Sequence, residues 1–129
     1  MPDIYLGDVY LIPTPPNGSH YFVAITKLDN GSFLFVNYST VRDSTPDEYL
    51  DFTISPSRTK IRFLTQESYF VFGSAKEYGS AELTALGATH KGAFSRDEVE
   101  KIQFAAITNN SLKNKYRKLI RTYLGLPPV

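Results

Sequence analysis

Two short stretches of the chain hold residue types that act together in acid–base and phosphate chemistry. His20 begins the apolar stretch HYFVAIT, Ser39 and Thr40 end the stretch FLFVNYST, and Arg42 follows two residues later. An imidazole exchanges protons near neutral pH, hydroxyls hydrogen-bond phosphate oxygens, and a guanidinium neutralises their charge. These residue types can carry acid–base chemistry and can bind an anion.

The segments around these residues predict a β-hairpin. Both stretches alternate aromatic and β-branched residues, and the DNGS sequence at 29–32 between them is a strong turn signal. In an antiparallel hairpin the start of one strand lies beside the end of its partner. We therefore expect His20 to meet Thr40 and Ser39 at one rim of a sheet, roofed by the PTPPNGS loop at 13–19.

A structural interpretation of the same residues stays open. His20 can be a polar residue at a strand start that bonds the loop backbone, and Thr40 can simply terminate its strand. A metal site is not expected, because His20 and His90 lie in separate loops and the chain has no cysteine. Phosphate-loop, zinc-protease and EF-hand motifs are also missing, so no cofactor is predicted.

The remaining segments predict a mainly β or α+β fold. Strands are expected over 4–12, 49–55 and 68–76, helices over 80–87, 95–107 and 111–124, and a loop over 89–94. The segment 56–67 is ambiguous between helix and strand. At 129 residues, the chain predicts a single domain. A β-barrel body would cover about 1–90 and a helical C-terminal extension about 91–129.

Composition limits the classes of protein to consider. The chain is 42% hydrophobic and 21% charged, as in globular domains. Its apolar runs are only four or five residues, far short of the ~20 that a membrane span needs. The first residues also lack the features of a signal peptide, so a cytoplasmic location is expected.

The last predicted helix concentrates positive charge. Residues 111–124 hold five basic residues and no acid, although the net charge of the whole chain is only +1. Such a segment could contact nucleic acid, acidic lipid or an acidic face of a protein, and Lys113, Lys115 and Arg117 are the candidate RNA or phosphate contacts. Alternatively, the basic residues are simply the solvated face of the helix. The apolar stripe of the helix either packs on the barrel or forms a face for a dimer or a protein partner; it consists of Leu112, Tyr116, Leu119 and Tyr123.

Several segments together resemble the MazF/PemK/Kid toxin family. The proteins of this family are small SH3-like barrels that cleave RNA. The resemblance rests on GDVYLI at 7–12, SHYFVAIT at 19–26, FLFVNYST at 33–40 and ESYFVFGSAK at 67–76. It implies a PemK-like barrel and a toxin-type endoribonuclease that cleaves single-stranded RNA without metal, by attack of the ribose 2′-hydroxyl on the adjacent phosphate. It also implies RNA, an antitoxin-like protein and a second copy of the chain as partners.

The same resemblance assigns roles to individual residues. The catalytic arginine of the family falls on His20, and its threonine or serine falls on Thr40, with Ser39 beside it. The sequence departs from the family at its Arg-Pro pair, which is His20-Tyr21 here, and in the longer tail from about Lys91. A fold does not fix a function, so a non-catalytic SH3-like module that binds a protein or nucleic acid is the alternative.

Overall fold

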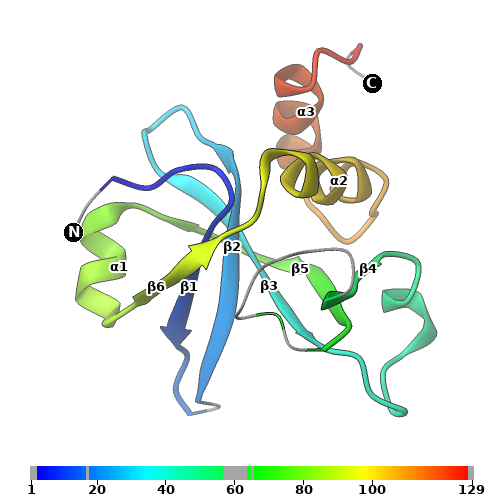
Figure 1. Cartoon of the computed structure of the whole chain (residues 1–129). Helices are drawn as coiled ribbons and strands as arrows, with labels where there is room; N and C mark the ends of the chain where they lie inside the picture. Colours follow the sequence, from blue (N-terminus) through cyan, green and yellow to red (C-terminus); the bar gives the residue numbers. More distant parts are fainter. Residues whose placement is uncertain (1–2, 17, 57–63, 65, 128–129) are drawn as a thin grey trace.

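The computed structural model describes residues 3–16, 18–56, 64 and 66–127, and over these residues six strands form one antiparallel sheet (Figure 1). The strand order is β4-β5-β3-β2-β1-β6. Their bounds are β1 Asp8–Pro13, β2 Ser19–Lys27, β3 Phe33–Thr40, β4 Thr53–Ile54, β5 Ser68–Tyr78 and β6 Thr89–Ala93.

Helices accompany this sheet. A 3₁₀ turn, η1, spans Asp47–Tyr49, and the α-helices are α1 Ser80–Leu86, α2 Arg96–Ile107 and α3 Asn114–Tyr123. The mainly β, α+β class that the sequence predicted is therefore confirmed. In the part of the chain that the structure describes, no helix is long and apolar enough to cross a membrane.

The predicted hairpin is confirmed as β2 and β3. The two strands pair antiparallel with Tyr21 opposite Tyr38, and the two rings stack with centroids 5.5 Å apart. Gly31 turns the chain with φ at 87°, a conformation that favours glycine. This register determines which residues meet at the far end of the hairpin, where β2 begins and β3 ends.

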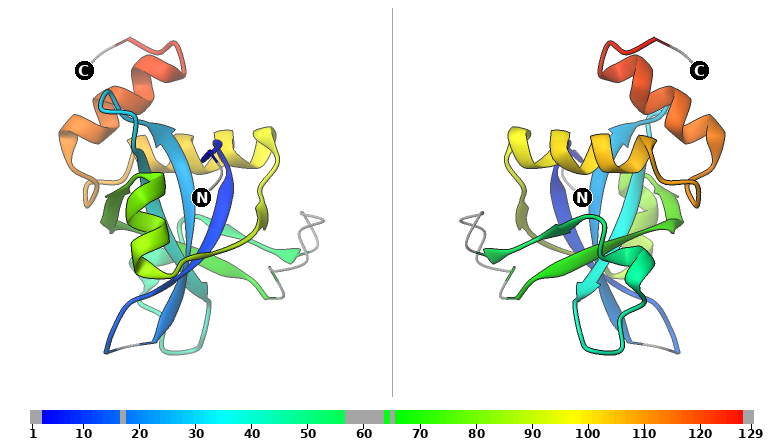
Figure 2. Two further views of the ribbon diagram at one scale, coloured as in Figure 1. Left: turned by 90° about the vertical axis from the view of Figure 1, so that its left-hand side faces the viewer. Right: turned by 90° about the vertical axis from the view of Figure 1, so that its right-hand side faces the viewer.

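Each face of the sheet buries its own apolar cluster. On one face Val23, Val36 and Phe70 pack with residues of α2 and α3, and on the other Phe22 and Phe35 pack with residues that include Leu83 of α1. Figure 2 shows α1 and the α2–α3 pair on different sides of the strands. The C-terminal helices therefore share a core with the strands.

The long helices follow the sequence signals closely. The Ser95 hydroxyl accepts a hydrogen bond from the backbone N–H of Glu98, and the Glu98 side chain accepts one from the backbone N–H of Ser95, which is the predicted capping box. On α3, Tyr116 is 8% exposed and Ile120 is fully buried, so this part of the predicted stripe packs inward, whereas Tyr123 at the end of the stripe is 51% exposed.

Two segments differ from the sequence prediction. Residues 89–93 were expected in a loop but form β6, which pairs with β1 although THKGA has no apolar alternation of its own. The strand expected over 49–55 is reduced to Thr53–Ile54, because the residues before it turn into η1. Most of the ambiguous segment 56–67 lies outside the described residues.

Candidate functional site

A pocket of about 480 Å³ opens at the rim where β2 begins and β3 ends. Its walls come from these two strands, from the start of β5 and from the loop after β3. The lining includes four residues that the sequence had singled out, together with tyrosines of three strands: His20, Ser39, Thr40, Arg42, Tyr21, Tyr38 and Tyr69. The hairpin and the loop after it thus bring a histidine, two hydroxyls and a cation to one opening.

His20 is held at this rim by the loop that precedes it. The side chain is half-buried, it pairs across the sheet with Ile12 of β1, and its ring Nδ1 lies within hydrogen-bond distance of the Thr14 hydroxyl. In the described part of the chain, Nε2 has no hydrogen-bond partner. The ring is therefore anchored at one nitrogen, Nδ1.

Strand alternation separates the two hydroxyls. Tyr21 lies opposite Tyr38, so His20 and Ser39, one residue along each strand, share the other face of the sheet. Thr40 lies on the face of Tyr38, which packs into the core beneath α2 and α3. Both hydroxyl residues line the pocket, but Ser39 is the one on the side of His20.

Arg42 is exposed on the loop that closes the pocket. Its backbone N–H donates to the Thr45 hydroxyl at 2.9 Å, and the Thr45 N–H donates back to the Arg42 carbonyl at 3.0 Å. These two bonds make a tight turn that holds the Arg42 backbone beside the opening. The guanidinium can then reach an anion in the pocket while the loop stays fixed.

Aromatic rings supply a further wall. Tyr69 of β5 pairs with Ser39 and stacks on Tyr49 of η1 with ring centroids 5.0 Å apart. Tyr38 is 5% exposed, and burial, with the nearby Tyr21, raises the pKa of its hydroxyl, so this group stays protonated. Tyr69 was missed from the sequence, because its place depends on the pairing of β3 with β5, strands that are distant in sequence.

The basic residues of the tail are not part of this pocket. Lys113 precedes α3, and Lys115 and Arg117 lie on it. In Figures 1 and 2, α3 lies at the top and the loop from β1 to β2, next to the pocket, lies at the bottom. Lys115 lies 4.0 Å from Glu77, and Arg117 donates to Asn110 at 3.5 Å. These cations form a separate surface at the other end of the molecule.

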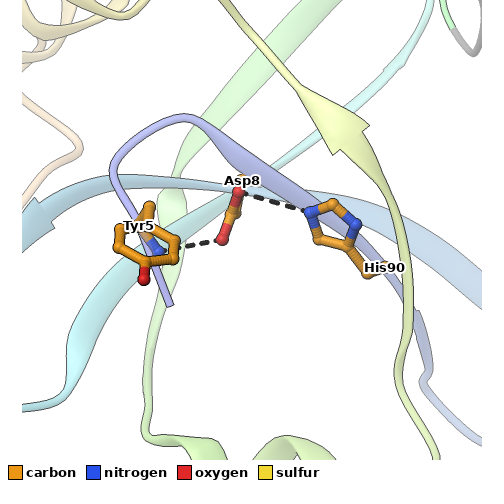
Figure 3. A network of polar contacts seen from close by, with 3 residues as sticks. All are labelled: Tyr5, Asp8 and His90. Atoms are coloured by element: carbon orange, nitrogen blue, oxygen red, sulfur yellow. Dashed lines mark hydrogen bonds and ion pairs between the residues drawn. The ribbon is translucent and has the colours of Figure 1, made fainter. Parts of the chain in front are cut away.

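The second histidine lies in a different network, drawn in Figure 3. His90 of β6 approaches the Asp8 carboxylate of β1 with its Nε2 at 3.3 Å, and the backbone N–H of Tyr5 donates to the other carboxylate oxygen at 2.8 Å. Asp8 is only 7% exposed. The contact joins β1 to β6, which also pair as neighbouring strands. The described residues contain no group of three or more potential metal ligands.

Comparison with known proteins adds no assignment. No protein-family model matches the chain, and a search of curated proteins finds no match either.

Proposed function

We propose that this protein is a metal-independent endoribonuclease that cleaves single-stranded RNA, built on a divergent SH3-like barrel of the PemK type and acting in the cytoplasm. The observation that carries the proposal is the rim pocket, in which His20, Ser39 and Arg42 gather beside Tyr69. Cleavage of an RNA phosphodiester requires a proton acceptor, and a hydroxyl donor and a cation can bind the phosphate. An aromatic ring can stack on the neighbouring base.

The reaction follows from these groups. His20 Nε2 takes the proton of a ribose 2′-hydroxyl, and the 2′-oxygen forms a bond to the adjacent phosphorus. The bond from phosphorus to the 5′-oxygen then breaks, and this oxygen leaves with the electron pair and takes a proton from water. Arg42 and the Ser39 hydroxyl stabilise the charge that develops on the phosphate oxygens. The products are a 2′,3′-cyclic phosphate and a 5′-hydroxyl.

Single-stranded RNA is the substrate class that the pocket favours. Unpaired bases stack on aromatic side chains, whereas the bases of a duplex are already stacked. The Tyr69 ring, supported from behind by Tyr49, offers such a surface beside the phosphate groups. Cleavage by the 2′-hydroxyl also excludes DNA, which lacks this nucleophile.

The test is cleavage of mixed single-stranded RNA in the presence of a chelator. The wild type is expected to produce fragments that end in a cyclic phosphate, and His20→Ala is expected to lower the rate by ~10²–10⁴-fold, the usual effect of losing a general base. His90→Gln, which changes the other histidine, is the control. The proposal fails if His20→Ala cuts as fast as the wild type, or if no cyclic phosphate forms.

A non-catalytic binding module is the second candidate. It is favoured by the Thr14 contact, which gives the His20 ring a structural partner, and by the basic surface of α3. Such a module would bind RNA, or an acidic face of a protein such as an antitoxin or a second copy, without cutting. RNA that binds to the wild type and to His20→Ala equally well, and stays intact with both, would select this candidate.

A further inference from the structure

The Thr14 hydroxyl lies between the ring of His20 and the carbonyl of Gly18. Thr14 Oγ1 is 2.8 Å from the Gly18 carbonyl oxygen. The same carbonyl oxygen also accepts a hydrogen bond of 2.7 Å from the backbone N–H of Thr14. The same Oγ1 contacts His20 Nδ1. The Thr14 hydroxyl therefore contacts both the Gly18 carbonyl oxygen and the Nδ1 atom of His20.

Hydrogen counting decides the direction of these bonds. A threonine hydroxyl has one hydrogen to donate, and a carbonyl oxygen can only accept. The hydrogen of Thr14 must point to Gly18, because two oxygens 2.8 Å apart without a hydrogen between them would repel each other. Oγ1 is then an acceptor toward the ring, so His20 carries a hydrogen on Nδ1.

We propose that Thr14 is a positioning residue that holds neutral His20 as the Nδ1–H tautomer, with the lone pair on Nε2. The hydrogen bond made by one ring nitrogen determines which nitrogen bears the proton. The role of Nε2 toward RNA rests on the proposed function, whereas the tautomer itself does not. No sequence motif points to Thr14, which stands only as part of a proline-rich loop.

The turn explains why Thr14 can hold this position. Pro13 of β1 pairs with Ser19 of β2. Thr14 is therefore the first residue after β1, and His20 is the second residue of β2. The loop between them is closed by the bond from the Thr14 N–H to Gly18.

The test measures the tautomer directly. We would record the ring-nitrogen chemical shifts of ¹⁵N-labelled full-length protein without RNA at about pH 8.5, well above the ordinary histidine pKa of ~6.5. His90→Gln assigns the signals of His20. In the wild type and in Thr14→Ser, Nδ1 is expected to be protonated and Nε2 unprotonated. In Thr14→Val, which removes only the hydroxyl, this preference is expected to disappear.

Cleavage measurements then connect the tautomer with the chemistry. Thr14→Val is expected to lower kcat by ~10–100-fold, as loss of a partner that orients a functional histidine commonly does, with KM little changed and with Thr14→Ser restoring the rate. A wild-type spectrum with the proton on Nε2, or a Thr14→Val spectrum identical to that of the wild type, overturns the inference. If His20→Ala cuts RNA normally while the spectra are as expected, the proposed function fails and the tautomer assignment stands.

Discussion

At the scale of single residues, the two hydroxyls at the end of β3 are not equivalent. Ser39 lies on the same face of the sheet as His20, whereas Thr40 lies on the face of Tyr38 and pairs with Ser68, which is 3% exposed. A phosphate held by His20 is therefore within reach of Ser39 first. The family resemblance assigned the catalytic role to Thr40, so the two residues provide a direct comparison.

We predict that Ser39→Ala slows RNA cleavage by about 10–100-fold, the effect expected when a hydrogen bond to a charged oxygen is removed. Thr40→Val, which keeps the shape of the side chain and removes the hydroxyl, should change the rate less than threefold, about 0.6 kcal/mol. Single-turnover rates on one defined RNA measure both variants. A larger loss in Thr40→Val than in Ser39→Ala would contradict the assignment by strand face.

The residues of the pocket also show how far the sequence could be interpreted. The neighbourhood of His20 and Ser39 was predictable, because a hairpin with a four-residue turn fixes which ends meet. Tyr69 could not be found, because its place depends on pairing between β3 and β5, which the sequence does not specify. Thr14 was missed because its role depends on where one hydrogen of a turn residue points.

At the scale of elements, α3 is docked on the sheet by a tyrosine. The Tyr116 hydroxyl donates to the Glu77 carboxylate of β5, and its ring is buried at 8% exposure. Burial, together with this bond and the negative charge of Glu77, raises the pKa of Tyr116 to about 12 from an ordinary value of 10.0. The helix is therefore attached by a group that must keep its proton.

We predict that this attachment weakens at alkaline pH. The unfolded chain loses the Tyr116 proton at about pH 10 and the folded chain keeps it to about 12, so the stabilisation is complete below pH 10 and is lost as pH rises toward 12. Tyr116→Phe should unfold about 1 kcal/mol more easily at neutral pH. It should also lose less stability than the wild type between pH 9 and 11, as urea unfolding can measure.

The matched control for this change is Tyr5→Phe. Tyr5 is 65% exposed, so removal of its hydroxyl should leave the alkaline decline unchanged. Parallel curves of unfolding free energy against pH for Tyr116→Phe and the wild type would show that the Glu77 bond is not the cause of the decline.

The elements also differ in how well the sequence predicted them. The helix α2 was predictable, because its capping box and its apolar spacing are both local signals. The strand β6 was not, because THKGA becomes a strand only through pairing with β1 and through the contact of His90 with Asp8. Tertiary pairing here decides the conformation of a segment whose own sequence favours a loop.

At the scale of the whole molecule, the candidate chemistry and the strongest concentration of positive charge lie at opposite ends. The rim pocket contains Arg42, and the surface of α3 contains Lys113, Lys115 and Arg117. Leu112, just before α3, and Ile120 on it are 1% and 0% exposed, so this side of the helix is already covered by the protein's own core. The exposed side presents Lys113 and Lys115, and it also presents the ring of Tyr123. The cations suit the phosphates of an RNA.

Changes to the α3 surface should therefore affect RNA binding, whereas changes to the rim pocket should affect RNA cleavage. We predict that changing Lys113, Lys115 and Arg117 together to Gln weakens RNA binding and flattens its dependence on salt, by about 0.7 in the logarithmic slope for each phosphate that is no longer neutralised. The cleavage rate of bound RNA should stay unchanged, because none of these residues lines the pocket. His20→Ala should do the opposite: it should slow cleavage by ~10²–10⁴-fold without altering the salt slope.

The control for charge alone changes Lys27, Lys76 and Lys91 to Gln, which removes the same number of positive charges from exposed positions on the strands. If RNA binds through the side chains of Lys113, Lys115 and Arg117 themselves, this variant keeps most of the affinity and the salt slope of the wild type. Equal weakening in both triple variants would mean that α3 is only a solvated face, and that RNA responds to the net charge of the protein.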